Sequence, residues 1–261
     1  MRIIATVLLL AAVSPGVEAQ NHASPPAPRD AVAQVPFGPG ERLDYRITYG
    51  ILGKRGSAST EVVAVEDIRG HQAYHLSFRM KGGALGFGMD DLQESWLDVG
   101  QLYSHRFRQD LNQTTYERLH TLDFYPADRV WRRVEKVDSG ELASDRPLDD
   151  VSFLYWARTL PFEVGKTYEF QRYFKESGNP VVLKVLRRET VKVPAGTFNT
   201  IVVQPLIRTS GLFSDGGRAE VYFTDDDRRM IVLLKTRMSI GTLQLQLERY
   251  APGEALAGAG R

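Results

Sequence analysis

The sequence predicts an all-β protein: a single large curved antiparallel sheet or half-open barrel, with about 13 strands in meander order and one short buried helix. Apolar and polar residues alternate in segment after segment, as in residues 42–49, where Leu43, Tyr45 and Ile47 share one face. Turn sequences separate these segments at intervals of about 10 to 14 residues. One segment near the middle of the chain has helical spacing instead.

The N-terminal residues have the features of an export signal. Residues 1–19 combine a basic Arg2, a short apolar run and small residues before Gln20, which predicts a cleaved signal peptide; an uncleaved anchor is the alternative. Residues 20–35 are rich in Ala and Pro and predict an extended linker. The sequence contains no cysteine, so neither a disulfide nor a lipid-bearing cysteine is available. We expect a periplasmic protein that is not a lipoprotein and has no transmembrane helix.

The predicted β-rich domain covers residues 36–250, and residues 251–261 form a flexible tail. Turn residues such as Gly, Pro, Asn and Asp lie between its strands and favour pairing of neighbours. The strands are predicted at 42–49, 58–67, 73–80, 92–99, 103–109, 115–125, 130–137, 167–174, 181–193, 200–206, 218–224, 229–237 and 242–250.

The helix is predicted over residues 151–160. Asp149 and Asp150 precede it and suit an N-cap and a first turn, and Pro161 follows it. We expect Asp150 and Ser152 to cap this helix and Arg158 to pair with a carboxylate. Apolar residues cover most of its circumference, so it should lie buried against the concave side of the sheet.

Charge and histidine spacing exclude several functions. The net charge is +1 and like charges form no block, so nucleic-acid binding has no support. His71 and His75 lie about 13 Å apart on a strand and cannot share a metal ion. His105 and His120 lie on strands that can pair and so can approach each other, but they lack a third ligand. We therefore predict neither a metal site nor a cofactor.

The sequence contains no recognisable catalytic motif. No nucleophile elbow occurs, and the paired aspartates lie at turns or at the helix start, where capping explains them. We therefore predict no catalytic residue and a protein that is not an enzyme.

Glycine-rich residues 82–89 and the many aromatic residues are the candidates for ligand binding. Residues 82–89 lack the lysine of a phosphate loop and predict an apolar connection, which is either a lid or a hairpin loop packed on the sheet. Aromatic side chains on a concave face suit an acyl chain, although they also suit a plain core. The candidate ligand-binding residues are Leu85, Phe87, Met89, Trp96, Phe107, Trp131 and Trp156.

Several short sequence segments, in this order, resemble the sequences of the bacterial exported proteins of domain-of-unknown-function family 3108. They are the F-G-P-G-E-x-L-x-Y that begins at Phe37, the D-V-S-F-L-Y-W-A-R that begins at Asp150, the G-x-x-Y that begins at Gly165, the V-P-A-G-T-F that begins at Val193 and the V-Y-F-T-D-D-D-R-R that begins at Val221. The resemblance implies a β-rich protein of the cell envelope without an established activity. The expected fold is also similar to the half-open barrels of periplasmic lipoprotein carriers, but a fold alone does not fix a function.

Three functional hypotheses follow. The first is non-enzymatic binding of a lipid, another hydrophobic ligand or an envelope partner in the concave face of the sheet. The second is a structural or assembly factor of the envelope that acts through exposed sheet edges. The third is a hydrolase whose site combines His105, His120 and scattered aspartates.

Overall fold

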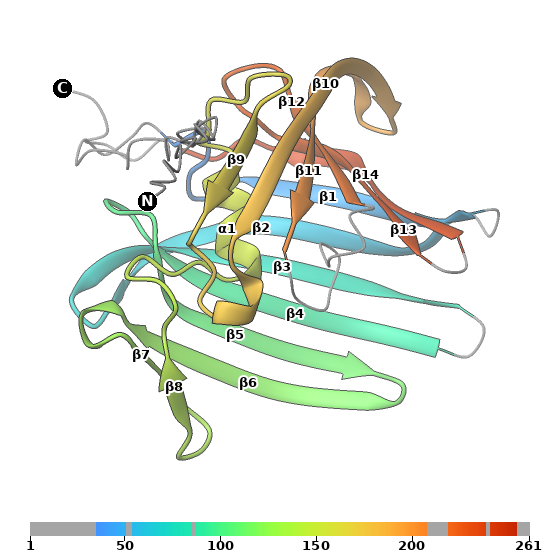
Figure 1. Ribbon diagram of the computed structural model, residues 1–261. Helices are drawn as coiled ribbons and strands as arrows, with labels where there is room; N and C mark the ends of the chain where they lie inside the picture. The colour runs from blue at the N-terminus through green and yellow to red at the C-terminus, as the bar shows by residue number, and fades with distance from the viewer. Residues whose placement is uncertain (1–34, 51–53, 85–86, 208–218, 239–240, 255–261) are drawn as a thin grey trace, which may run out of the picture.

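The computed structural model describes residues 35–50, 54–84, 87–207, 219–238 and 241–254 (Figure 1). The predicted signal peptide and almost all of the predicted linker lie outside these ranges, as do the last seven residues of the predicted tail. In the part of the chain that the structure describes, no helix has the length and apolar character needed to cross a membrane.

Fourteen strands form one antiparallel sheet in the described residues, as predicted. The strands are β1 (Arg42–Tyr49), β2 (Lys54–Ile68), β3 (His71–Ala84), β4 (Phe87–Asp98), β5 (Ser104–Gln113), β6 (Tyr116–Tyr125), β7 (Val130–Arg133), β8 (Ser139–Glu141), β9 (Thr167–Phe170), β10 (Val181–Val193), β11 (Gly196–Leu206), β12 (Ala219–Thr224), β13 (Ile231–Met238) and β14 (Gly241–Ala251).

The first and last strands pair in the middle of the sheet. β1 pairs with β14, so an N-terminal wing of β1 to β8 and a C-terminal wing of β14 to β9 extend in opposite directions. β8 and β9 are the two free margins, and they do not pair with each other. Instead, Leu148 and Tyr173 form a parallel bridge between the segments that follow these strands. The sheet is therefore a half-open barrel rather than a closed one.

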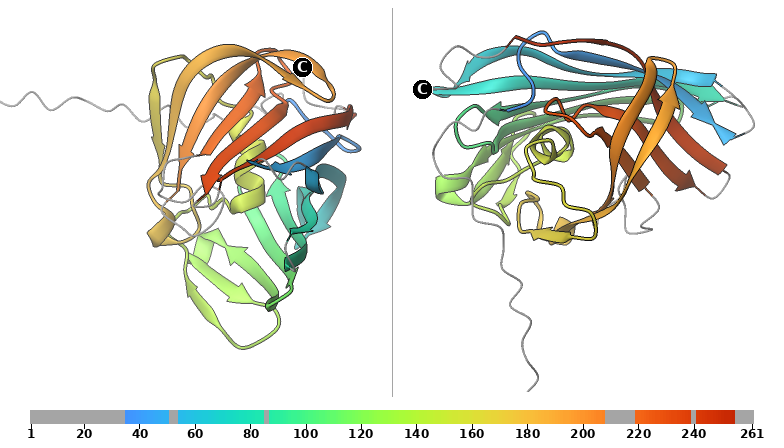
Figure 2. Two further views of the ribbon diagram at one scale, coloured as in Figure 1. Left: turned by 90° about the vertical axis from the view of Figure 1, so that its right-hand side faces the viewer. Right: turned by 90° about the horizontal axis from the view of Figure 1, so that it is seen from above.

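Bulges bend the long strands. The register shifts between Asp44 and Tyr45, between Val62 and Ala64, and between Trp96 and Leu97, among other places. A β-bulge increases local twist and bends its strand, so the two wings curve toward each other. Figure 2 shows the resulting shape, with the helix seen nearly end-on between the wings in its right-hand view.

The single α-helix of the described residues, α1 (Asp150–Ala157), fills the space between the wings. Seven of its eight residues, from Val151 to Ala157, are buried, as its apolar circumference predicts. Burial of each large apolar side chain contributes about 1.5–3 kcal/mol. Tyr155 and Tyr74 of β3 both contact the ring of Phe37 edge-on, with centroids 5.0 and 5.3 Å away. The helix therefore serves as the core of the curved sheet.

A buried carboxylate anchors the start of the helix. Asp149, with Ser152, forms a capping box, in which Asp149 Oδ1 accepts from the amides of Val151 and Ser152. Its other oxygen accepts from the hydroxyls of Ser95 on β4 and Ser104 on β5, at 2.7 and 2.5 Å. The prediction that Asp150 caps the helix was wrong, because the chain turns one residue earlier and Asp150 occupies the first turn.

A buried ion pair holds the other end. Arg158 donates to both carboxylate oxygens of Glu41, at 2.5 and 2.9 Å, and also to the carbonyls of Pro36 and Arg228. The expected pairing of Arg158 with a carboxylate is confirmed. The helix ends earlier than predicted, at Ala157, and Arg158 is its C-cap.

Two segments that were not predicted as strand belong to the sheet. Residues 82–84 and 87–89 continue the ladder of β3 and β4, with Gly82 opposite Met89 and Gly83 opposite Gly88, so the expectation of a loop was wrong for these positions, and residues 85–86 lie outside the described residues. The short strand β8 was not predicted, and in it Gly140 lies directly opposite Trp131. A Cβ at Gly140 would come within 2.6 Å of the Trp131 indole, so glycine permits this close packing.

The anchoring role of Asp149 makes a prediction for stability. Asp149→Ala removes the N-cap acceptor and leaves two buried serine hydroxyls without it, which should lower the free energy of unfolding by about 2–3 kcal/mol. Urea denaturation measures the change, with the exposed turn variant Asp227→Ala as control. Equal stability of the two variants would contradict the anchoring role.

Gly196 has a φ of 139°, a conformation that side chains with a Cβ rarely adopt. Gly196→Val should therefore destabilise the protein by about 1–3 kcal/mol. Gly88→Val is the matched control, because Gly88 also lies on a strand but has no positive φ, and its Cβ would meet its nearest neighbour at 3.6 Å. Thermal unfolding followed by circular dichroism compares them, and a Gly196→Val protein as stable as the control would refute the constraint.

Candidate binding site on the concave face

The concave face is identified by the residues that contact α1. Ser95 of β4 and Ser104 of β5 bond to Asp149, so their side chains point toward the helix. Side chains alternate along a strand, and residues that pair directly across an antiparallel ladder share a face. Gln93, two residues from Ser95, therefore also points inward, and so do its successive partners Gln109 of β5 and His120 of β6.

The predicted ligand-binding residues lie on both faces. Phe107 and Trp156 are buried on the concave side, where Phe107 lies 6.2 Å from Phe174 and Trp156 contacts Phe170 edge-on at 4.7 Å. Trp131 is half-buried on the same side, opposite Phe124. Trp96 lies on the outer face, stacked on His75. These aromatic residues therefore do not form one surface.

The remaining three predicted residues lie near the tip of the β3–β4 hairpin. Met89 is half-buried opposite Gly82. Phe87 begins β4, but its side chain is not among those that the structure describes, and Leu85 lies outside the described residues.

The concave face is tightly packed around the helix. A cavity of about 10 Å³ lies beside Leu154, Phe162 and Phe223, which is too small for an acyl chain. The aromatic residues around α1 therefore serve mainly as core.

Beyond the helix, the concave face carries apolar side chains that remain partly exposed. They are half-buried and come from five strands: Tyr49, Met80, Met89, Leu111 and Leu243. The Tyr49 hydroxyl and Gln93 Oε1 are buried there without a hydrogen-bond partner. Half-covered apolar groups beside unpaired polar atoms are typical of ligand sites, where a few polar groups orient a mostly apolar ligand.

The two histidines that were expected to approach each other, His105 and His120, lie on opposite faces of the sheet. His105 points outward because the bulge between Trp96 and Leu97 places Ser104, not His105, on the inner face. His120 points inward opposite Gln109. The expectation that these histidines approach each other was therefore wrong, and they cannot form one site.

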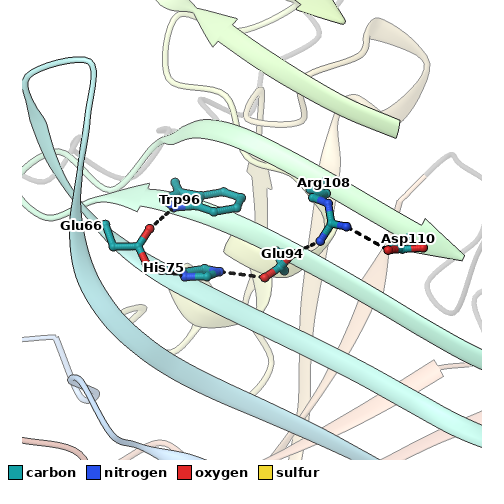
Figure 3. Close-up of polar contacts among 6 residues, drawn as sticks. All are labelled: Glu66, His75, Glu94, Trp96, Arg108 and Asp110. Atoms are coloured by element: carbon teal, nitrogen blue, oxygen red, sulfur yellow. Dashed lines mark hydrogen bonds and ion pairs between the residues drawn. The ribbon is translucent and has the colours of Figure 1, made fainter. Parts of the chain in front are cut away.

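The outer face of the N-terminal wing carries a polar network (Figure 3). The His75 ring donates from Nδ1 to Glu66 and from Nε2 to Glu94, both at 2.9 Å. Arg108 donates hydrogen bonds to both Glu94 and Asp110, and the Trp96 indole donates to Glu66 at 2.8 Å. Each carboxylate of this network accepts from a donor within it, so the network is satisfied without a ligand.

The charges of this network shift its pKa values. Burial acts to lower the pKa of His75, but hydrogen bonds and charges from Glu94 and Glu66 outweigh burial and raise it above 6.5. Hydrogen bonds from Trp96 and from His75 respectively hold the pKa values of Glu66 and Glu94 below 4.5. The network is therefore strongest between about pH 4.5 and pH 6.5.

His71, Asp98 and His105 form a second outer cluster, whose ligand-type atoms lie within 4.8 Å of one another. Two histidines and a carboxylate are a common zinc ligand set. In this arrangement, however, His105 Nε2 bonds to Asp98 at 2.9 Å, and the other Asp98 oxygen accepts from two backbone amides. The His71 ring stacks on His105 at 4.6 Å. Hydrogen bonding and stacking thus account for the cluster, which the sequence analysis did not find.

Comparison with known proteins agrees with this architecture. The profile of a family of proteins of unknown function, DUF3108, matches residues 44–248. A β-barrel-like protein of domain of unknown function DUF1849 from Brucella abortus gives a TM-score of 0.52 at 9% identity, over 84% of this chain and 99% of that one. A protein with a YmcC-like fold from Bacteroides fragilis gives 0.37 at 13% identity, over 83% and 98%. No curated protein sequence matches the chain.

The His75 network makes a prediction for pH dependence. A histidine whose pKa is raised on folding stabilises the protein below its unfolded pKa, and this contribution is lost as the pH rises through the folded value. His75→Gln should therefore cost about 1 kcal/mol more at pH 5.5 than at pH 9. Urea denaturation at both pH values measures this, with His22→Gln as control. An equal cost at both pH values would contradict the assignment.

Proposed function

The chain belongs to the DUF3108 family, whose function is unknown, and we propose that this member binds a hydrophobic ligand with an acyl chain in the concave face of its sheet. It does so without catalysis, in the periplasm, after removal of its signal peptide. The observation that carries the proposal is the half-buried apolar surface beyond α1, made by Tyr49, Met80, Met89, Leu111 and Leu243.

The shape of the sheet supports this surface as a site. The two margins, β8 and β9, leave the sheet unclosed, so the concave face is reached from solvent without separating any pair of strands. Apolar surface that stays accessible in a folded protein is a common mark of ligand or partner binding. A ligand there would cover side chains that α1 does not reach.

Action through sheet edges is the second candidate function. The margin strands β8 and β9 are only three and four residues long, but β6 and β10 each extend past the four residues that pair with β7 and β9, so both wings also offer strand edge beyond these pairs. Crosslinking in cells that recovers a protein partner, with purified protein free of lipid, would favour this second function.

Leu111 and Leu119 provide a matched test of the proposal. Both are leucines of the β5–β6 hairpin. Leu111 is half-buried on the concave face, whereas Leu119 lies opposite Asp110 on the outer face and is 56% exposed. Leu111→Gln should weaken binding of a fluorescent fatty-acid probe about tenfold, since it places an amide against the chain. Leu119→Gln should leave binding unchanged.

The measurement is fluorescence titration of the delipidated mature protein. Wild-type protein that neither binds the probe nor gains melting temperature with long-chain lipids would refute the proposal. Equal effects of the two substitutions would place the site elsewhere.

A further inference from the structure

Four basic side chains gather on the concave face near the free margin of the N-terminal wing, and we call them the basic cluster. Arg118 and His120 lie on β6, Arg133 lies on β7, and Lys175 follows β9 as the N-cap of the 3₁₀-helix η3 (Glu176–Gly178). The sequence alone does not reveal this set, because its members come from three separate segments.

The sheet register and a ring contact bring the four together. Arg133 pairs with Leu122, two residues from His120 and on the same face. Lys175 follows Phe174, whose ring stacks on Phe124 of β6 at 5.2 Å. The cluster therefore spans the gap between the two wings.

The hydrogen bond between Arg118 and His120 fixes the position of the histidine proton. A guanidinium can only donate, so His120 Nδ1 must accept from it. Burial, and then the charges of Arg118, Arg133 and Lys175, lower the pKa of His120 to about 4, so the ring is neutral near pH 7. Its one proton is then on Nε2, which is buried and has no hydrogen-bond partner.

A second donor nearby lacks an acceptor. Arg133 Nε is also buried without a partner, although the same guanidinium reaches Asp138 at 3.3 Å through Nη2. A buried donor without an acceptor costs about 1–3 kcal/mol. Both donors lie on one face of the sheet and can each bond an acceptor group from outside the chain.

In the described part of the chain, two charges of the cluster lack an ion-pair partner, although the carboxylates of Glu135 and Asp150 act on His120 and Lys175. Among the described residues, neither Arg118 nor Lys175 forms an ion pair with a carboxylate. Partial desolvation of its ammonium group, followed by the charge of Arg118, lowers the pKa of Lys175, although the nearby Asp150 opposes this. Asp150 itself accepts from the Tyr173 hydroxyl.

We propose that the basic cluster binds the phosphate group of an amphiphile whose chain lies on the half-buried apolar surface, an inference that rests on the proposed function. Arg118 pairs directly across the ladder with Leu111, so the cluster and the apolar surface adjoin. A phosphate offers three or more acceptor oxygens to the four donor side chains, whereas a carboxylate offers two. A metal ion does not fit, because the cluster consists almost entirely of donors.

The first test compares three ligands on delipidated wild-type protein by titration calorimetry. Dodecyl phosphate should bind about tenfold more tightly than uncharged 1-dodecylglycerol, because it adds charge-assisted hydrogen bonds. Titration with inorganic phosphate shows whether the site binds a free anion or requires the phosphate of a lipid head group. Equal affinity for the two dodecyl compounds would overturn the phosphate site and leave the proposed function standing.

The second test uses neighbouring arginines on β7. Arg133 points inward, whereas Arg132 points outward and lies over the Tyr125 ring at 4.7 Å. Arg133→Gln and Lys175→Gln should each weaken dodecyl phosphate about fivefold or more and leave 1-dodecylglycerol unchanged. Arg132→Gln should change neither, and melting temperatures identify any variant that fails to fold. Because Lys175 is exposed, its variant keeps the test valid if Arg133→Gln is unstable.

The remaining outcomes separate the two proposals. Inorganic phosphate that binds in an Arg133- and Lys175-dependent way, without binding of either dodecyl compound, would keep the phosphate site but overturn the amphiphile and the proposed function. Binding of none of the three would overturn both. Equal loss in Arg132→Gln and Arg133→Gln would also overturn the assigned site.

Discussion

The hydrogen bonds of the Asp149 carboxylate are the constraint on which the rest of the structure depends. This fully buried group joins three elements, because it accepts from the first turn of α1, from Ser95 of β4 and from Ser104 of β5. Its neighbour Leu148 exchanges backbone hydrogen bonds with Arg172 and Phe174, beyond the opposite margin of the sheet. One short stretch therefore fixes the helix inside the curve and also sets how far apart the two wings lie. Burial raises the pKa of Asp149, and the four hydrogen bonds offset part of that cost.

This arrangement gives the two faces of the N-terminal wing different roles. On the outer face, carboxylates and basic groups alternate along the ladders and mostly bond one another, as around His75 and as in the bond between Arg106 and Asp123, although Arg46 Nε on β1 is buried without a partner. On the concave face, buried donors at His120 and Arg133 lack acceptors, although both strands are otherwise regularly paired. Unsatisfied buried polar groups are rare in folded proteins, and each one needs an explanation. The two unpartnered donors on the concave face therefore locate the candidate site more clearly than the positions of any one residue type, such as the aromatic residues.

The sequence predicted the strands, their meander order, the apolar helix and the pairing of Arg158 with a carboxylate, because each depends on a local period or on one isolated charge. It could not predict which face of a strand points inward when both faces carry apolar residues. Trp96 and Phe107 both looked like candidates for the concave face, yet only Phe107 lies there. A single bulge after Trp96 also decided that His105 turns outward, where it meets Asp98 and His71. The basic cluster could not be predicted either, because its four members come together only after the wings have curved.

The position of the basic cluster also bears on why the sheet remains open. Pairing of β8 with β9 would bring Arg133 and Lys175 into a closed interior, with Asp138 the one carboxylate at hydrogen-bond distance from either in the described part of the chain. Moving unpaired charges out of water costs several kcal/mol per ion, more than a few ladder hydrogen bonds return. The Leu148–Tyr173 bridge instead joins the wings beside the helix, and Lys175 of the cluster remains exposed. An open margin lined with basic groups thus follows from the same electrostatics that would favour an anion there.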